Sequence, residues 1–214
     1  MRIGVLALQG DFALHAKALA RRGVEPVEVR KPEALQAVDG LIIPGGESTT
    51  LLRLMEAWAF APAIEVFHRA CKPVFGTCAG LIVLAREVVN PRQFSLGLID
   101  VSVGRNAYGR QRESFEARAV AALDGPPAEI EMVFIRAPRI LHVGPGVEVL
   151  ARLADEPVLA RQGTVLVATF HPELTDDPTV HRYFCRMASG SERGDGTSSD
   201  PSTRGGLADS VRRA

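Results

Sequence analysis

Apolar runs and amphipathic stretches alternate along the first 85 residues. The apolar runs are typical of parallel strands buried on both faces, and they predict strands at 2–8, 39–44 and 73–75, with a shorter one at 25–29. The amphipathic stretches predict helices at 12–22, from the 45–50 loop to about 58, and at 62–70. Because strands that alternate with helices form a parallel sheet covered on both faces, this half of the chain predicts an open, doubly wound α/β fold.

The rhythm changes after residue 87, where strands follow one another without helices between them. We expect strands at 97–103, 115–120, 129–135 and 147–153, and a hairpin of 157–160 with 164–170 around Gln162-Gly163. A last helix is expected at about 178–188. This half should add antiparallel strands to the mostly parallel sheet, either by extending it or by packing on it.

The residues from Ser189 onward are mostly Gly, Ser, Asp, Thr and Arg, with scarcely any large apolar side chain. Such a segment cannot bury enough surface to offset its ordering entropy. We therefore expect one domain at 1–188 and a disordered C-terminal tail at 189–214.

The charge balance argues against nucleic acid and membrane as partners. Lys+Arg and Asp+Glu each number 25, so no basic field attracts phosphates or acidic lipids. We expect neither a signal peptide nor a membrane span, because the N-terminus runs straight into a strand and no apolar run is long enough. The 3 cysteines are widely spaced without a CxxC pair, which favours a reducing, cytoplasmic location over a disulfide framework or a zinc site.

One stretch carries a candidate nucleophile. Residues 73–85 read as a strand, a sharp turn with Cys78 at its apex, and a helix, with Gly76 and Gly80 two residues away on either side. This is the G-x-S-x-G nucleophile-elbow pattern with sulfur in place of oxygen, which holds its central residue in a strained conformation clear of the sheet. The N-terminus of the following helix favours a thiolate. The alternative is a cysteine that is simply buried in a βα turn.

A second stretch carries a candidate base. The buried-type strand at 165–170 leads into His171-Pro172-Glu173, and Pro172 keeps the chain extended at His171. Residues two apart in an extended chain point to the same side, so we expect the Glu173 carboxylate to fix the His171 imidazole. The alternative is a capping histidine beside an exposed glutamate. The other histidines are expected to be helix-surface or structural residues: His15, His68, His142 and His181.

Two adjacent glycines, Gly45 and Gly46, follow another predicted parallel strand and should open on the same edge of the sheet. They permit a backbone that turns its N–H groups inward, as an oxyanion hole requires. The second donor would be the N–H of Ala79, the residue after the nucleophile. A tight βα loop without a catalytic role is the alternative.

Three stretches, 44–49, 76–80 and 170–173, together resemble class I (triad-type) glutamine amidotransferases. Three more, 8–11, 105–111 and 134–138, are similar to the glutaminase subunits of bacterial pyridoxal 5′-phosphate synthase, which supply ammonia to a separate synthase subunit. The six stretches occur in collinear order across residues 1–188. The resemblance therefore covers the whole predicted domain, and it implies a flavodoxin-like sheet of the class I glutamine amidotransferase type.

By position, the resemblance implies a triad in which Cys78 is the nucleophile, His171 the base and Glu173 its partner. The oxyanion hole would use Gly46 and Ala79. The implied glutamine-binding positions are Gly46, Glu47, Ser48, Arg105, Ile135 and Arg136. The implied reaction is hydrolysis of L-glutamine to L-glutamate and ammonia for vitamin B6 biosynthesis, without a metal or organic cofactor. The implied partner is the synthase subunit.

The residues alone leave other interpretations open. The chain could be a glutaminase for another biosynthetic pathway, a different cysteine hydrolase or peptidase of similar fold, or a degenerate module that only regulates a partner. Tyr108 and Arg110 are expected on a surface or at an interface. We also expect the isolated subunit to be a poor glutaminase, because the Gly45-Gly46 peptide can adopt more than one orientation.

Overall fold

The computed structural model describes residues 1–105 and 114–190. The expectations for Tyr108 and Arg110, and for the tail beyond residue 190, concern residues outside this range. The strands are β1 Arg2–Leu6, β2 Glu25–Val29, β3 Gly40–Ile43, β4 Val74–Thr77, β5 Ala85–Val89, β6 Ile99–Gly104, β7 Ser114–Ala121, β8 Ala128–Ile135, β9 Arg139–Val143, β10 Glu148–Leu153, β11 Glu156–Gln162 and β12 Val165–Ala168. The helices are α1 Phe12–Ala20, α2 Ser48–Ala57, α3 Phe60–Arg69, α4 Ala79–Leu84 and α5 Thr179–Ser189, with short 3₁₀ turns at Pro32–Ala37 and Pro172–Leu174.

Five parallel strands form one half of the larger sheet, in the order β2-β1-β3-β4-β12 with β2 at the edge. This is the flavodoxin-like order, with its switch point beside β1 and β3. In the register of β4 with β12, Thr77 lies opposite Ala168. The loops that carry Cys78 and His171 therefore leave neighbouring strands at the same carboxyl edge, where ligands bind in such sheets.

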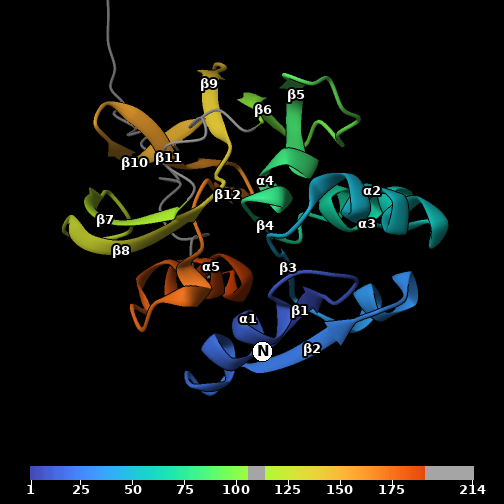
Figure 1. Ribbon diagram of the computed structural model, residues 1–214. Helices are drawn as coiled ribbons and strands as arrows, with labels where there is room; N and C mark the ends of the chain where they lie inside the picture. The colour runs from blue at the N-terminus through green and yellow to red at the C-terminus, as the bar shows by residue number, and fades with distance from the viewer. Residues whose placement is uncertain (106–113, 191–214) are drawn as a thin grey trace, which may run out of the picture.

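Helices cover both faces of this sheet (Figure 1). Successive residues of a strand point to opposite faces. In β3, Leu41 and Ile43 pack in one core cluster with residues of α2, α3 and α4, whereas Ile42 packs in a second cluster with residues of α1 and α5. Both faces are thus apolar, which explains the continuous apolar runs of the central strands, and the predicted doubly wound sheet is confirmed.

The added strands both extend the sheet and pack beside it. Within the described residues, β11, β10, β7 and β8 continue the larger sheet to nine strands, and β5, β6 and β9 form a second sheet of three. The predicted hairpin is the antiparallel pair β11–β12. Two strands escaped the sequence analysis. β5 follows α4 without a turn residue, and β9 has two adjacent apolar residues in place of an alternating pattern, so neither showed a strand signal.

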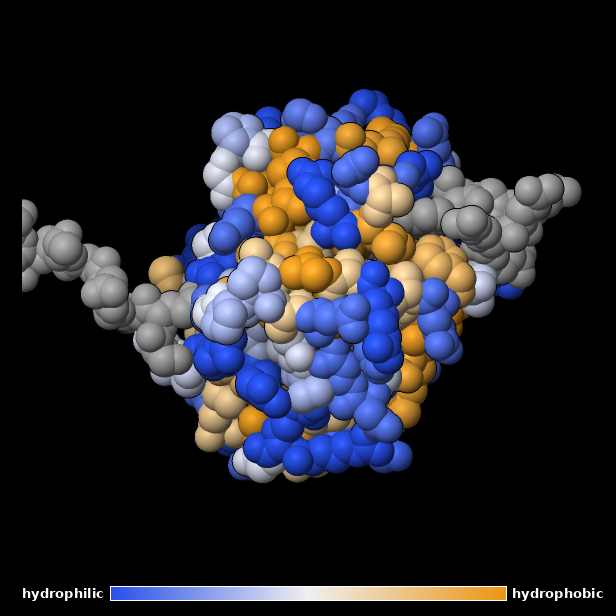
Figure 2. Space-filling model, turned by 90° about the vertical axis from the view of Figure 1, so that its left-hand side faces the viewer, coloured by the Kyte–Doolittle hydropathy of each residue, from blue (hydrophilic) through white to orange (hydrophobic). Residues whose placement is uncertain are grey.

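The β7–β8 end of the larger sheet lies on the side shown in Figure 2, where hydrophilic residues dominate the lower half and hydrophobic residues form a band across the upper half. Among the exposed large hydrophobic side chains is Val120 of β7. Among residues 1–105 and 114–190, the helices are too short or too polar to cross a membrane. The last helix, α5, ends at Ser189 and is followed by Gly190 in the left-handed region, one residue beyond its predicted end.

Candidate active site

Cys78 occupies the sharp turn between β4 and α4. Its backbone angles are φ 50° and ψ −101°, a combination that non-glycine residues rarely adopt. The turn is fixed from both sides, because the Cys78 N–H donates to the Ala168 carbonyl at 2.9 Å and the Cys78 carbonyl accepts from Ile82 at 3.2 Å. The strained elbow expected from the sequence is therefore present, and it holds a side chain that is only 6% exposed.

Gly45 packs against His171 and Cys78, whereas its neighbour Gly46 packs against Gln9. A Cβ atom on Gly45 would lie 2.4 Å from Cε1 of His171 and 3.3 Å from Cβ of Cys78. Gly46 has φ +137°, a backbone conformation that side chains rarely adopt. Ala79, fully buried, is the first residue of α4, where backbone N–H groups lack helical acceptors. The two proposed oxyanion donors thus belong to separate elements, the loop after β3 and the first turn of α4.

His171 and Glu173 are in direct contact. Nδ1 of His171 lies 2.7 Å from Oε1 of Glu173, and both side chains are buried. The expected contact is present, but the extended chain expected for it is wrong: Pro172–Leu174 form a 3₁₀ turn. This turn brings the Glu173 carboxylate to the imidazole. The backbone N–H of His171 donates to the Val133 carbonyl of β8 at 2.8 Å.

The His171 imidazole is set up to hold a proton. Burial by itself lowers the pKa of His171, but the hydrogen bond with Cys78 and the one with Glu173 raise it to about 10. Burial likewise opposes ionisation of Glu173, yet contact with His15 and with His171 keeps the pKa of Glu173 below its usual value. The imidazole thus holds a proton in the same pocket as Cys78 and is supported by a carboxylate, the arrangement that a general acid–base needs.

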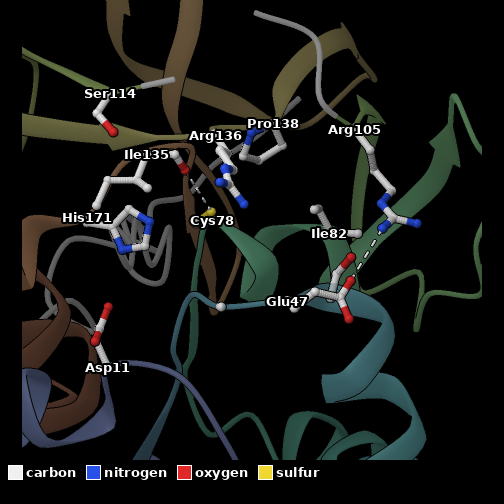
Figure 3. Close-up of a pocket in the computed structure, with 12 residues that line it drawn as sticks. Asp11, Glu47, Cys78, Ile82, Arg105, Ser114, Ile135, Arg136, Pro138 and His171 are labelled. Atoms are coloured by element: carbon white, nitrogen blue, oxygen red, sulfur yellow. Dashed lines mark hydrogen bonds and ion pairs between the residues drawn. The ribbon is translucent and has the colours of Figure 1, made fainter. Parts of the chain in front are cut away.

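A pocket of about 520 Å³ opens above Cys78 (Figure 3). Its lining includes Cys78 and His171, and it also includes every residue proposed to bind glutamine: Gly46, Glu47, Ser48, Arg105, Ile135 and Arg136. Figure 3 shows the Arg136 side chain beside Cys78, opposite Ile82. Four further residues line the pocket without a role predicted from the sequence. Asp11 and Pro138 end the 8–11 and 134–138 stretches, whereas Ile82 and Ser114 stand in none of the six stretches.

Glu47 caps α2 and pairs with Arg105. Its carboxylate accepts from the N–H groups of Thr49 at 2.9 Å and Thr50 at 2.7 Å. Burial tends to raise the pKa of Glu47, but these hydrogen bonds and that from the Thr50 hydroxyl hold it at about 2. The Arg105 guanidinium, only 16% exposed, lies 3.6 Å from Glu47 Oε1. The pocket wall therefore carries a fixed negative and a fixed positive group, which suit the ammonium and carboxylate of an amino acid.

Two histidines that the sequence analysis set aside also belong to this region. His15 and His181 are fully buried, so the helix-surface interpretation is wrong for them. Nε2 of His15 lies 3.3 Å from Oε2 of Glu173, and Nδ1 of His15 lies 3.0 Å from Nε2 of His181. One signal could have revealed His15, because it shares the apolar face of α1 with Ala18 and Leu19 at helical spacing.

One group in the described residues has donor atoms spaced for a cation. Ligand atoms of Asp11, His171 and Glu173 lie within 4.8 Å of one another. His171 and Glu173 already use their facing atoms in the 2.7 Å hydrogen bond. A cation here would displace the proton that this pair holds, so the geometry favours proton chemistry over metal binding.

Comparisons with known proteins agree with this arrangement. The model of the SNO glutamine amidotransferase family matches residues 5–189. A pyridoxal 5′-phosphate synthase subunit PdxT from Koribacter versatilis is 53% identical over 195 residues, which cover 91% of this chain and 100% of the relative. A subunit of the same name from Thermosipho africanus is 51% identical, with 87% of this chain and 98% of the relative covered.

Solved structures give the same result. A crystal structure of a glutamine amidotransferase is 50% identical and superimposes with a TM-score of 0.82 over 87% of this chain and 98% of that one. The structure of PurLQS from Thermotoga maritima, at 17% identity and a TM-score of 0.63 over 86% of this chain and 97% of that one, shares the fold alone. The match of the family model over nearly the whole domain and the identity to relatives of full length show that the chain belongs to the SNO glutamine amidotransferase family.

Proposed function

We propose that this protein is the glutaminase subunit of a pyridoxal 5′-phosphate synthase, which hydrolyses L-glutamine and delivers the ammonia to a synthase subunit. The observation that carries the proposal is the Cys78 elbow with the buried His171–Glu173 pair beside it in one pocket. The names of the two relatives, both subunits of pyridoxal 5′-phosphate synthase, suggest the pathway. A cytoplasmic location remains a prediction.

The reaction starts with attack of the Cys78 sulfur on the side-chain amide carbon of glutamine. The oxyanion that forms accepts hydrogen bonds from the N–H groups of Gly46 and Ala79. His171 gives its proton to the leaving nitrogen, and ammonia departs from a γ-glutamyl thioester. His171 then takes a proton from water, which attacks the thioester, releases glutamate and restores the thiolate–imidazolium pair.

The walls of the pocket account for an amino-acid substrate. The Glu47 carboxylate, with a pKa of about 2, is negative at neutral pH and suits the α-ammonium group. Arg105 and Arg136 line the pocket and suit the α-carboxylate, since a guanidinium binds carboxylates through two parallel hydrogen bonds. Ile82 and Ile135 supply apolar contact for the methylene groups of the side chain.

Ammonia has to leave toward the acceptor subunit without release into water. The Gln9-Gly10-Asp11 turn touches the Gly45-Gly46 loop, since the Glu47 N–H donates to Gln9 Oε1 at 3.3 Å and a Cβ atom on Gly10 would lie 1.8 Å from the Gly45 oxygen. Both loops border the site. We place the docking surface of the synthase subunit over these two loops.

The test is turnover and covalent labelling with the synthase subunit present. Glutamine should be hydrolysed, whereas asparagine and peptides should not. A glutamine-analogue electrophile should add one label at Cys78, in a background in which the exposed Cys71 is replaced by serine. Labelling of Cys78 without glutamine turnover would point to a degenerate regulatory module, and turnover of peptides would point to a different cysteine hydrolase.

A further inference from the structure

Buried histidines continue the triad beyond Glu173. His15 of α1 and His181 of α5 come from helices on the same face of the sheet and meet under the catalytic edge. The Glu173 carboxylate lies between two imidazoles, with His171 at 2.7 Å from Oε1 and His15 at 3.3 Å from Oε2. Neither His15 nor His181 lines the substrate pocket.

We propose that His15 is a positioning residue of the triad, whose Nε2–H holds the second oxygen of Glu173 so that the first stays aimed at His171. The 3.3 Å contact is within ion-pair range, but no hydrogen bond aligned with Oε2 exists among the described residues. The interaction is therefore that of an N–H dipole with a buried negative charge, which is strong where water is excluded.

The proton positions follow from what each atom can accept. An ionised carboxylate only accepts, and a bare Nε2 lone pair of His15 at 3.3 Å would repel it, so we assign the proton to Nε2, which then donates to Thr77 Oγ1. Nδ1 of His15 is then an acceptor, and its 3.0 Å contact assigns the proton on His181 to Nε2. This leaves Nδ1 of His181 unprotonated, and it is the atom that lacks a hydrogen-bond partner in the described part of the chain. His181 thus fixes the tautomer of His15.

The environment keeps both outer histidines neutral. Burial lowers the pKa of His15, and burial together with repulsion from His15 lowers the pKa of His181 to about 3. A neutral His15 supports the charge of Glu173 without competing with His171 for it. Nε2 of His15 also lies 3.3 Å from Oγ1 of Thr77, the residue before the nucleophile, so the same atom contacts both strand ends that carry the triad.

Loss of the His15 donor should raise the pKa of the buried Glu173 carboxyl, because burial would no longer be offset on that side. A neutral Glu173 no longer supports the His171 imidazolium, so the acid limb of the activity profile should move to higher pH. The other charged or titratable groups near this carboxylate are His171 itself, Asp11 and, beyond His181, Arg22. All three stay in place when His15 is changed.

The matched variants are His15→Gln and His15→Asn. A glutamine amide nitrogen reaches the place of imidazole Nε2, whereas an asparagine amide nitrogen reaches only that of Nδ1. With the synthase subunit present, His15→Asn should lower kcat about 10-fold at unchanged KM, because the buried Glu173 carboxylate loses the N–H dipole beside it. Its acid limb should move up by about one pH unit, and His15→Gln should restore most of the rate.

The inference rests on the proposed glutaminase function, so a second readout does not use glutamine. The rate at which iodoacetamide alkylates Cys78, followed against pH in the Cys71→Ser background, should show the same shift in His15→Asn. If the pH dependence of Cys78 alkylation shifted in His15→Asn but the protein did not hydrolyse glutamine, the proposed function would be refuted and the positioning role of His15 would stand. His68→Leu, a change in α3 away from the pocket, should alter neither readout.

His15→Leu makes the same comparison should His15→Asn not fold, since leucine restores apolar packing without a donor. Melting temperature reports folding for each variant. Equal kcat and equal acid limbs in the glutamine variant and in whichever donor-free variant folds would overturn the proposal. So would a loss of rate that follows melting temperature alone.

Discussion

Gly76 and Gly80 pack backbone against backbone on either side of Cys78: a Cβ atom on Gly76 would lie 2.6 Å from the carbonyl carbon and oxygen of Gly80. A Cβ atom on Gly80 would in turn lie 2.1 Å from the Ile43 carbonyl oxygen. Backbone atoms cannot yield as the end of a flexible side chain can. The elbow therefore keeps its shape only while both positions are glycine.

Gly80→Ala should lower the free energy of unfolding by about 3 kcal/mol or more, because overpacking against backbone forces strand β3 and helix α4 apart. The control is Gly97→Ala, at φ +67° with nothing within 4 Å of the added Cβ, which should cost only about 1–2 kcal/mol for its left-handed backbone. Urea unfolding measures both. If Gly80→Ala and Gly97→Ala lowered the free energy of unfolding equally, the backbone contact at the elbow would tolerate a Cβ atom.

Cys78 itself should be strained. Cys78→Gly should raise the free energy of unfolding by about 1 kcal/mol, because glycine tolerates φ 50°, ψ −101° and a side chain does not. Cys78→Ala retains the strain and should stay near the wild-type stability. Neither variant should hydrolyse glutamine, and His171→Ala should lose about 10²–10⁴-fold in kcat. Near wild-type turnover in Cys78→Ala would remove the proposed mechanism.

Acid should destabilise the fold well above the range in which carboxylates titrate. The pKa of buried His181 is lowered to about 3, so below the ordinary histidine value the unfolded chain takes up a proton that the folded chain does not. The contribution of His181 to the free energy of unfolding is therefore complete above about pH 6.5. It falls by about 1.4 kcal/mol per pH unit as the pH drops toward 4.5. His15, whose pKa burial also lowers, acts in the same direction.

His181→Leu should remove its share of that slope between pH 6.5 and 4.5, measured by urea unfolding at several pH values. Val180→Ala, a change at the neighbouring buried residue of α5, should lower stability equally at every pH and leave the slope unchanged. His171 does not contribute in this window, because its raised pKa of about 10 adds stability that is complete below pH 6.5 and is lost only as pH rises toward 10. An unchanged slope in His181→Leu would show that this histidine is protonated in the folded protein.

The triad residues and the parallel strands of the larger sheet could be predicted from the sequence because their signals are local. The Cys78 turn is marked by two flanking glycines, and His171 and Glu173 are two residues apart. His15 and His181, by contrast, are separated by 166 positions, and they meet only because α1 and α5 pack on the same face of the sheet. No pattern within either helix states which other helix it will touch, so the positioning role of His15 could emerge only from the tertiary structure.

Truncation after Gly190 should leave melting temperature and glutamine hydrolysis nearly unchanged. The last described helix, α5, ends at Ser189 with Gly190 as its left-handed cap, so this cut preserves the whole helix. The residues removed have the composition of a chain that does not build a core. A fall of many degrees in the melting scan would show that the tail packs on the domain.

The Gly45-Gly46 peptide offers a switch for the oxyanion hole. Its oxygen lies against Gly10, where a Cβ atom would come within 1.8 Å. Because a trans peptide is planar, the Gly46 N–H points the opposite way from that oxygen. The next N–H, of Glu47, is held by Gln9 at 3.3 Å. A partner that contacts the Gln9 turn can therefore move the peptide that supplies the proposed Gly46 donor.

The synthase subunit should consequently raise kcat on glutamine about 10²–10³-fold over the isolated glutaminase, the effect of gaining one oxyanion donor. Gly46→Ala should stay near the low rate with or without the partner, because Gly46 has φ +137° and a Cβ there would lie 2.5 Å from the Gln9 amide. The Gly97→Ala variant, changed far from this loop, should respond to the partner as wild type does. Steady-state glutamate formation with and without saturating synthase measures all three. Equal rates in the two conditions would refute gating by the partner and would leave the triad itself untouched, since Cys78, His171 and Glu173 do not depend on the orientation of this peptide.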